Sequence, residues 1–167
     1  MRLPWPVTRG PIRVHTGGAF LSEAEIRRLT IEDYDELLAL WRRAGLDSLK
    51  PLGRDSREAL ARQLDSGVQA ILGLAKDGDL VAAVVATHDS RKGWINRLVV
   101  DPRHRRQGYG ARLIAAAEEV LREQGIGVIA ALVESHNRAS LALFQRMGYV
   151  DAGAGIHYLS KRESDEV

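Results

Sequence analysis

Residues 99–110 read VVDPRHRRQGYG, and they indicate the fold more clearly than any other part of the chain. This stretch joins an apolar run at 93–100 to a segment whose apolar residues recur at helical spacing on one face: Leu113, Ile114, Ala117, Val120 and Leu121. Because glycine has no Cβ, backbone N–H groups near Gly108 and Gly110 can approach a ligand closely. The start of the following helix adds unpaired donors and the positive end of the helix dipole. The stretch therefore predicts a strand-to-helix corner that binds an anion.

The context of these glycines distinguishes them from other Gly-x-Gly triplets. The triplets at 125–127 and 153–155 lack this setting, whereas Gly108 and Gly110 follow a strand and have Arg105 and Arg106 just upstream to meet phosphate charge. A dinucleotide fingerprint would need a small residue at Leu113, and a P-loop would need Gly-Lys-Ser/Thr, which the chain lacks. The sequence excludes both of these phosphate motifs.

The elements around this corner follow from periodicity and turn residues. Before it we expect strands at 25–30, 69–76, 80–87 and 93–100, with a tight turn at Asp77-Gly78 and a hairpin loop at 89–92. A helix is predicted after Asp33, with one face made of Tyr34, Leu37, Leu38 and Trp41, and a second one at 56–65. After the corner we expect a long helix, a strand at 128–133, a helix capped by Asn137 and short strands at 149–150 and 156–159. This order predicts an α/β (α+β) fold with a mixed sheet.

Composition limits the class of protein. A chain of 167 residues with 45% hydrophobic content forms one core, and no apolar run approaches the roughly eighteen residues of a membrane span. The chain has no cysteine, which excludes disulfides, thiolate metal sites and a cysteine-bound acyl intermediate. Its five histidines show no paired ligand spacing, so we predict no metal. The net charge of +2 gives no case for nucleic acid, because three arginines near the N-terminus supply the positive excess.

The N-terminal residues read as a tail. Residues 1–22 hold three of the five prolines and no acidic residue, and their apolar residues are interrupted too often for a secretory signal. We therefore expect an irregular tail at 1–22, a domain at 23–162, a short tail at 163–167 and a cytoplasmic location. An expression vector or a misassigned start would explain the first segment equally well.

Two motifs together resemble a known family. The run VVDP at 99–102 followed by RRQGYG at 105–110 resembles the acetyl-CoA signature of the GNAT superfamily of N-acetyltransferases, in its small single-domain bacterial and archaeal form. Residues 137–149, NRASLALFQRMGY, are similar to the downstream helix of that family, and the resemblance spans about 26–159. It implies a mixed central sheet of about six to seven strands with four helices, in which two parallel strands splay apart at the cofactor cleft.

The resemblance also implies how acetyl-CoA is held. Backbone N–H groups of 106–110 would bind the pyrophosphate, backbone groups of Leu98 and Val100 would pair with pantetheine, and the Leu98 N–H would polarise the thioester carbonyl. The cofactor would lie between 98–100 and 128–133, where Asn137 touches its pantetheine arm. The predicted cofactor-binding residues are Leu98, Val99, Val100, Arg105, Arg106, Gln107, Gly108, Tyr109, Gly110, Asn137 and Phe144.

The implied reaction is direct attack of a primary amine on the thioester. A lysine-like amine has a pKa of about 10.4 and is mostly charged at neutral pH, so a group must accept its proton. Glu134 is the first candidate base, and Asp89 or His88 is the second. Many relatives use a tyrosine of the downstream helix as the acid for the leaving thiolate, but this chain has Phe144 there. Tyr149 or Tyr158 could replace it.

Two functions stay open. The first is an N-acetyltransferase for a small amine, an amino-acid derivative, a protein N-terminus or a lysine. The second is a catalytically silent acyl-CoA-binding or sensor protein, which the Phe144 departure keeps open. The resemblance further implies a tendency to form homodimers, and we expect no nucleic-acid or membrane partner.

Overall fold

The computed structural model describes residues 24–151. The strand expected at 156–159 and the tails expected at 1–22 and 163–167 lie outside them. The described elements are β1 (Glu25–Arg28), η1 (Ile31–Asp33), α1 (Tyr34–Ala44), α2 (Arg57–Asp65), β2 (Gln69–Lys76), β3 (Asp79–His88), β4 (Gly93–Val100), η2 (Pro102–His104), α3 (Tyr109–Glu123), β5 (Ile129–Ala131) and α4 (Arg138–Arg146).

The strands form one sheet in the order β1-β2-β3-β4-β5. The first four pair antiparallel, and β4 pairs with β5 parallel, so the sheet is mixed as predicted. The turn between β2 and β3 has φ values of 53° at Asp77 and 89° at Gly78, both in the left-handed region that tight hairpin turns use. Residues 80–86 of β3 are all buried, because helices cover both faces of this central strand.

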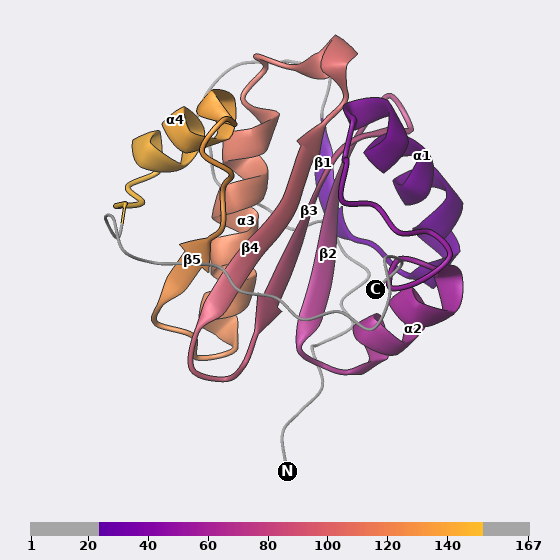
Figure 1. The fold of residues 1–167 in the computed structure, drawn as a ribbon, viewed down its shortest axis with the longest axis horizontal. Helices are drawn as coiled ribbons and strands as arrows, with labels where there is room; N and C mark the ends of the chain where they lie inside the picture. The colour runs from indigo at the N-terminus through magenta and orange to yellow at the C-terminus, as the bar shows by residue number, and fades with distance from the viewer. Residues whose placement is uncertain (1–23, 152–167) are drawn as a thin grey trace.

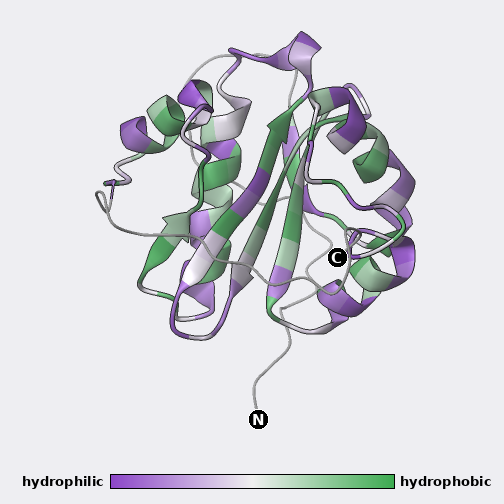
Figure 2. Ribbon diagram, in the orientation of Figure 1, coloured by the Kyte–Doolittle hydropathy of each residue, from purple (hydrophilic) through white to green (hydrophobic). Residues whose placement is uncertain are grey.

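Two helical layers enclose the sheet. Figure 1 shows α1 and α2 on one side of it and α3 and α4 on the other. Each layer has its own apolar cluster, and in Figure 2 hydrophobic residues dominate the central strands between them. The apolar stripe predicted on α3 is confirmed, since all five of its residues are at most 2% exposed: Leu113, Ile114, Ala117, Val120 and Leu121.

The structure corrects three details of the prediction. On α1 the fully buried leucines are Leu37 and Leu40, whereas Leu38 is only partly buried. The strand expected at 128–133 is shortened to β5, because β4 pairs with it only as far as Ile95. Residues 149–150 form no strand, since the Tyr149 N–H bonds to the Phe144 carbonyl and continues the end of α4. The described sheet therefore has five strands instead of six or seven, while the four α-helices agree with the expectation.

Within residues 24–151, none of the helices is both long enough and apolar enough to cross a bilayer.

Candidate functional site

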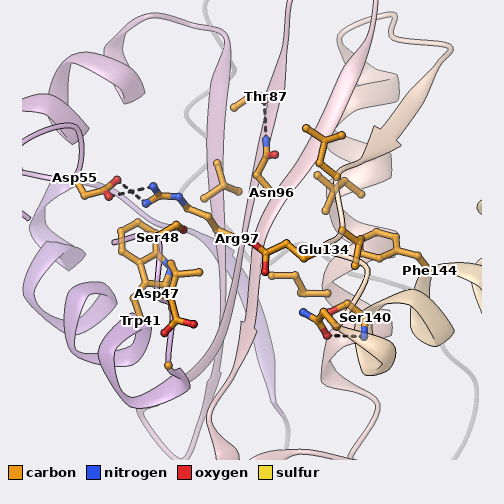
Figure 3. A pocket seen from close by; sticks show the side chains of 18 of the residues that line it. Trp41, Asp47, Ser48, Asp55, Thr87, Asn96, Arg97, Glu134, Ser140 and Phe144 are labelled. Carbon is orange, nitrogen blue, oxygen red and sulfur yellow. Dashed lines mark hydrogen bonds and ion pairs between the residues drawn. The ribbon is translucent and has the colours of Figure 1, made fainter. Parts of the chain in front are cut away.

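A cavity of about 900 Å³ opens where β4 and β5 separate. The two strands pair only from Gly93 to Ile95 of β4, so the second half of β4 faces β5 without a ladder between them. Figure 3 shows the cavity between α1 and its following loop on one side and α4 on the other. This is the splayed pair of parallel strands that the resemblance implied.

A β-bulge lies in the wall of this cavity. Ala83 pairs with Val99 and Val85 with Asn96, so Arg97 and Leu98 together oppose one residue of β3. Arg97 has φ 49°, a left-handed value that a residue with a side chain rarely adopts. A bulge bends its strand and re-aims the neighbouring groups, which accounts for the divergence of β4 from β5. No local pattern in the sequence predicts this bulge.

Beyond the bulge, some backbone groups of β4 point away from β3 and toward the cleft. The Asp101 N–H donates to Val81 on β3, and because edges alternate along a strand, Val100 directs its backbone groups to the opposite edge. Its carbonyl accepts a long hydrogen bond of 3.4 Å from Arg105 Nε. Leu98 lines the cavity, whereas Val99 is buried against the α1 layer.

The corner between β4 and α3 presents unpaired donors. Among the residues that the structure describes, no protein acceptor is bonded to the N–H groups of 106–110, and the first helical bond of α3 joins Arg112 N–H to the Gly108 carbonyl. Arg106 and Gly108 have φ of 65° and 79°, and a Cβ added to Gly108 would meet no atom within 4 Å. Consecutive free amides at the start of a 15-residue helix fit a diphosphate. Gln107 and Tyr109 lie in this run as predicted, although Tyr109 itself is buried.

Gly110 serves a different purpose from Gly108. A Cβ added there would lie 2.9 Å from Leu143 Cδ2 on α4, so its hydrogen lets α3 and α4 approach each other. The sequence could not separate these two roles, because both glycines belong to one motif.

A buried carboxylate fixes the corner in place. Asp101 is 1% exposed and accepts hydrogen bonds from the backbone and guanidinium of Arg103 and, at 3.1 Å, from Arg43 Nε on α1. These hydrogen bonds, led by those of the Arg103 side chain, hold the pKa of Asp101 well below its usual range. We did not identify this residue from the sequence.

Helix α4 forms the outer wall of the cavity. Asn137 caps it, as predicted, by accepting a hydrogen bond of 3.1 Å from the Ser140 N–H, and both residues line the cavity. Phe144 also lines the cavity but is only 7% exposed, and its ring meets that of Tyr149 edge to face at 5.0 Å.

The candidate acid and base residues fall in different places. Glu134 lines the cavity (Figure 3), and its carboxylate lies 3.1 Å from His136 Nε2. Tyr149 is not among the lining residues, and its hydroxyl donates to Glu118 on α3 at 2.9 Å. Burial and the Glu118 carboxylate raise the pKa of Tyr149 above its ordinary value. Tyr158 lies outside the described residues.

The second pair of candidate bases lies away from the cavity lining. The Asp89 carboxylate accepts hydrogen bonds from the N–H groups of Lys92 and Arg91 in the hairpin loop, and these bonds lower its pKa. His88 Nδ1 accepts from the Ser90 N–H in the same loop. Neither residue lines the cavity.

The inner wall of the cavity contains an ion pair that we did not predict. Arg97 donates to both oxygens of Asp55, at 2.5 and 3.0 Å, and its guanidinium lies 5.1 Å from the centre of the Trp41 ring. Asp55 is 3% exposed and belongs to the irregular loop between α1 and α2. Figure 3 shows the pair pointing across from that loop to the middle of β4.

Comparisons with known proteins agree with this geometry. A model of the acetyltransferase (GNAT) family matches residues 27–149. The fold is similar to that of AAC(6')-Iy in complex with a bisubstrate analogue of coenzyme A, with a TM-score of 0.71 and 18% identity over 84% of this chain and 100% of that one. It is also similar to the PaiA N-acetyltransferase from Thermoplasma acidophilum in complex with coenzyme A, with a TM-score of 0.66 and 20% identity over 75% and 88%. A GCN5-related N-acetyltransferase from Ralstonia eutropha gives a TM-score of 0.62 and 26% identity over 84% and 98%.

Proposed function

Because the chain belongs to the acetyltransferase (GNAT) family and is an acyltransferase, we propose that it moves an acetyl group from acetyl-CoA to a primary amine of a small molecule. The observation that carries this proposal is the row of amides at 106–110, which bond to no acceptor among the described residues and follow the end of β4 that is not paired with β5. A coenzyme A complex and a bisubstrate complex among the similar structures support the choice of donor.

The residues present fit acetyl-CoA. The amides of 106–110 would hold the diphosphate, and Arg105 and Arg106 add positive charge beside it. The edge of β4 at Leu98 and Val100 would pair with the pantetheine arm, with Asn137 on the opposite wall. For the Val100 carbonyl this requires only the loss of the weak bond to Arg105.

The reaction needs little from side chains beyond placing the amine. The amine nitrogen forms a bond to the thioester carbon, the carbon–sulfur bond breaks, and the thiolate leaves with its electron pair. Glu134 is the best placed described group to take the amine proton, because it alone of the candidate bases lines the cavity. The adjacent His136 can pass that proton to water.

No described tyrosine is placed to protonate the thiolate. Phe144 has no hydroxyl, and the Tyr149 hydroxyl is bonded to Glu118 outside the cavity lining. A coenzyme A thiolate is a tolerable leaving group, so we propose that it departs without a proton from either of them. The same two observations favour the second candidate, a binding or sensor protein that transfers nothing.

Release of free thiol from acetyl-CoA over a panel of primary amines tests the proposal. We expect amine-dependent thiol release, and an acetylated amine by mass spectrometry. We expect Glu134→Gln to lower kcat by about 100-fold or more, the contribution typical of a general base, with acetyl-CoA affinity kept. The matched control is Glu119→Gln, which removes an exposed carboxylate of α3 outside the cavity. Binding of acetyl-CoA with no turnover on any amine would reject the enzyme and favour the sensor.

A further inference from the structure

The half of the cavity that faces away from α4 is rich in hydrogen-bond donors. Its wall includes the guanidinium groups of Arg54 and Arg97 and the indole of Trp41. Arginine and tryptophan side chains donate hydrogen bonds and accept none. These three side chains therefore need oxygen acceptors.

Asp55 is the buried acceptor of this wall, and its oxygens are already used. They accept from both terminal nitrogens of Arg97 and, at 2.7 Å, from the Lys50 N–H. Arg54 Nε lies 4.0 Å from the nearer oxygen of Asp55, beyond hydrogen-bond distance. Arg54 Nε and Trp41 Nε1 are both buried, and neither donates to an acceptor within residues 24–151.

The charges of the wall also favour an anionic ligand. Arg97 and Arg54 share the one carboxylate of Asp55, at 2.5 Å and 4.0 Å, so this part of the wall has two guanidinium groups against one carboxylate. The Arg54 guanidinium is one third exposed, and the Ser48 carbonyl accepts a hydrogen bond from one of its terminal nitrogens. The acidic residues that line the cavity besides Asp55 are Asp47 at the exposed rim and Glu134 across from it. An ammonium group would meet carboxylates at the mouth, and an anionic group would meet guanidinium deeper inside.

We infer that the acceptor is a primary amine that also carries a carboxylate, on the scale of an amino acid, and that Arg54 binds this carboxylate. The inference rests on the proposed acetyl transfer and deepens it. The amine lies toward Glu134 while the carboxylate reaches the wall that Arg54, Arg97 and Trp41 form. Arg54 belongs to the irregular loop at 45–56, which can adjust to bring the Arg54 Nε–H to the ligand.

This assignment separates the chain from the aminoglycoside acetyltransferases that it resembles in fold. A polycationic acceptor such as sisomicin, which is bound in one of those structures, would bring positive charge against two guanidinium groups.

Matched acceptors test the inference. The twenty common amino acids, their α-carboxamides and sisomicin are compared as acceptors of acetyl-CoA, with kcat/KM measured for each. The carboxamide keeps the amine and removes only the negative charge. We expect the preferred amino acid to exceed its carboxamide by roughly 10- to 100-fold, the range of one hydrogen bond to a charged group, and to exceed sisomicin as well.

The variant Arg54→Met tests whether Arg54 binds the carboxylate of the acceptor. It should bring kcat/KM of the preferred amino acid to within about threefold of that of its carboxamide, because it removes one charge-assisted contact that only the carboxylate makes. Arg62→Met is the control, because it removes an arginine of the adjacent helix outside this cavity. A carboxamide or sisomicin turned over as well as every amino acid would overturn the inference and leave acetyl transfer standing.

A second readout does not depend on turnover. The shift in Tm of the coenzyme A complex is measured with the same acceptors, and we expect amino acids to raise it more than their carboxamides, in an Arg54-dependent way. If no amine releases thiol, the proposed function fails, and this readout still decides the inference. Equal shifts from carboxylate and carboxamide, or no shift from any amino acid, would overturn it.

Discussion

Replacing Gly108 with alanine separates the binding role of the corner from its backbone conformation. Gly108 and Gly125 stand at opposite ends of α3, with φ of 79° and 78°, and a Cβ added to either would meet no atom within 4 Å. Alanine at either position therefore suffers the same left-handed strain, about 1–2 kcal/mol, partly offset by the reduced entropy of the unfolded chain. We expect both variants to lose a similar few degrees of Tm.

Their affinities for acetyl-CoA should differ. The new methyl group of Gly108→Ala occupies the open space before the free amides and displaces the diphosphate from at least one of them. A hydrogen bond to a charged group contributes about 1.5–3 kcal/mol, so Kd should rise roughly 10- to 100-fold. Gly125→Ala should keep the wild-type Kd in isothermal titration calorimetry. Unchanged binding by Gly108→Ala, or an equal loss in Gly125→Ala, would refute the assignment of the corner.

Three further variants test the surroundings of the site. Gly110→Ala should lower the free energy of unfolding by about 1–3 kcal/mol in urea, because its methyl group overlaps α4, whereas Gly127→Ala, which meets no atom, should stay within about 0.5 kcal/mol. Tyr149→Phe should lose about 1–2 kcal/mol of stability and keep kcat, and a large fall in kcat would make Tyr149 the missing acid. Asp101→Asn should lower the free energy of unfolding by about 2 kcal/mol at pH 7. Because the pKa of Asp101 is depressed in the folded protein, this difference from wild type should shrink as the pH falls below about 4. A difference that grows in acid would contradict the ion-pair account.

Local patterns in the sequence predicted most of the fold. The left-handed turn at Asp77-Gly78, the cap at Asn137 and the apolar face of α3 each depend on residues within one or two turns of each other. Such features can be predicted from nearby residues alone, because a glycine at positive φ or a side chain bonded to a nearby amide needs no distant partner. The corner between β4 and α3 has local features of the same kind, since Arg106 and Gly108 both have positive φ, and its binding of phosphate stays a prediction.

The features that sequence reasoning missed depend on distant partners. Asp55 and Arg97 are 42 positions apart, and Arg43 and Asp101 are 58 apart. Neither carboxylate differs in local sequence from a solvated one, and only the packing of α1 and its loop on β4 buries them. The wall that Arg54, Arg97 and Trp41 form could not be predicted for the same reason. The irregular loop at 45–56 has no periodicity from which the positions of its side chains could be predicted.

The bulge in β4 places Arg97, which bonds to Asp55, next to Leu98, which lines the cavity. Left-handed backbone at Arg97 costs about 1–2 kcal/mol, and a bulge with that cost persists only when other contacts hold it. The two hydrogen bonds to Asp55 supply that hold, because hydrogen bonds to a charged group contribute about 1.5–3 kcal/mol each. Leu98, the next residue, has the N–H proposed to polarise the thioester. Asp55, which belongs to the loop between α1 and α2, therefore helps to hold the bulge and with it the position of the Leu98 N–H.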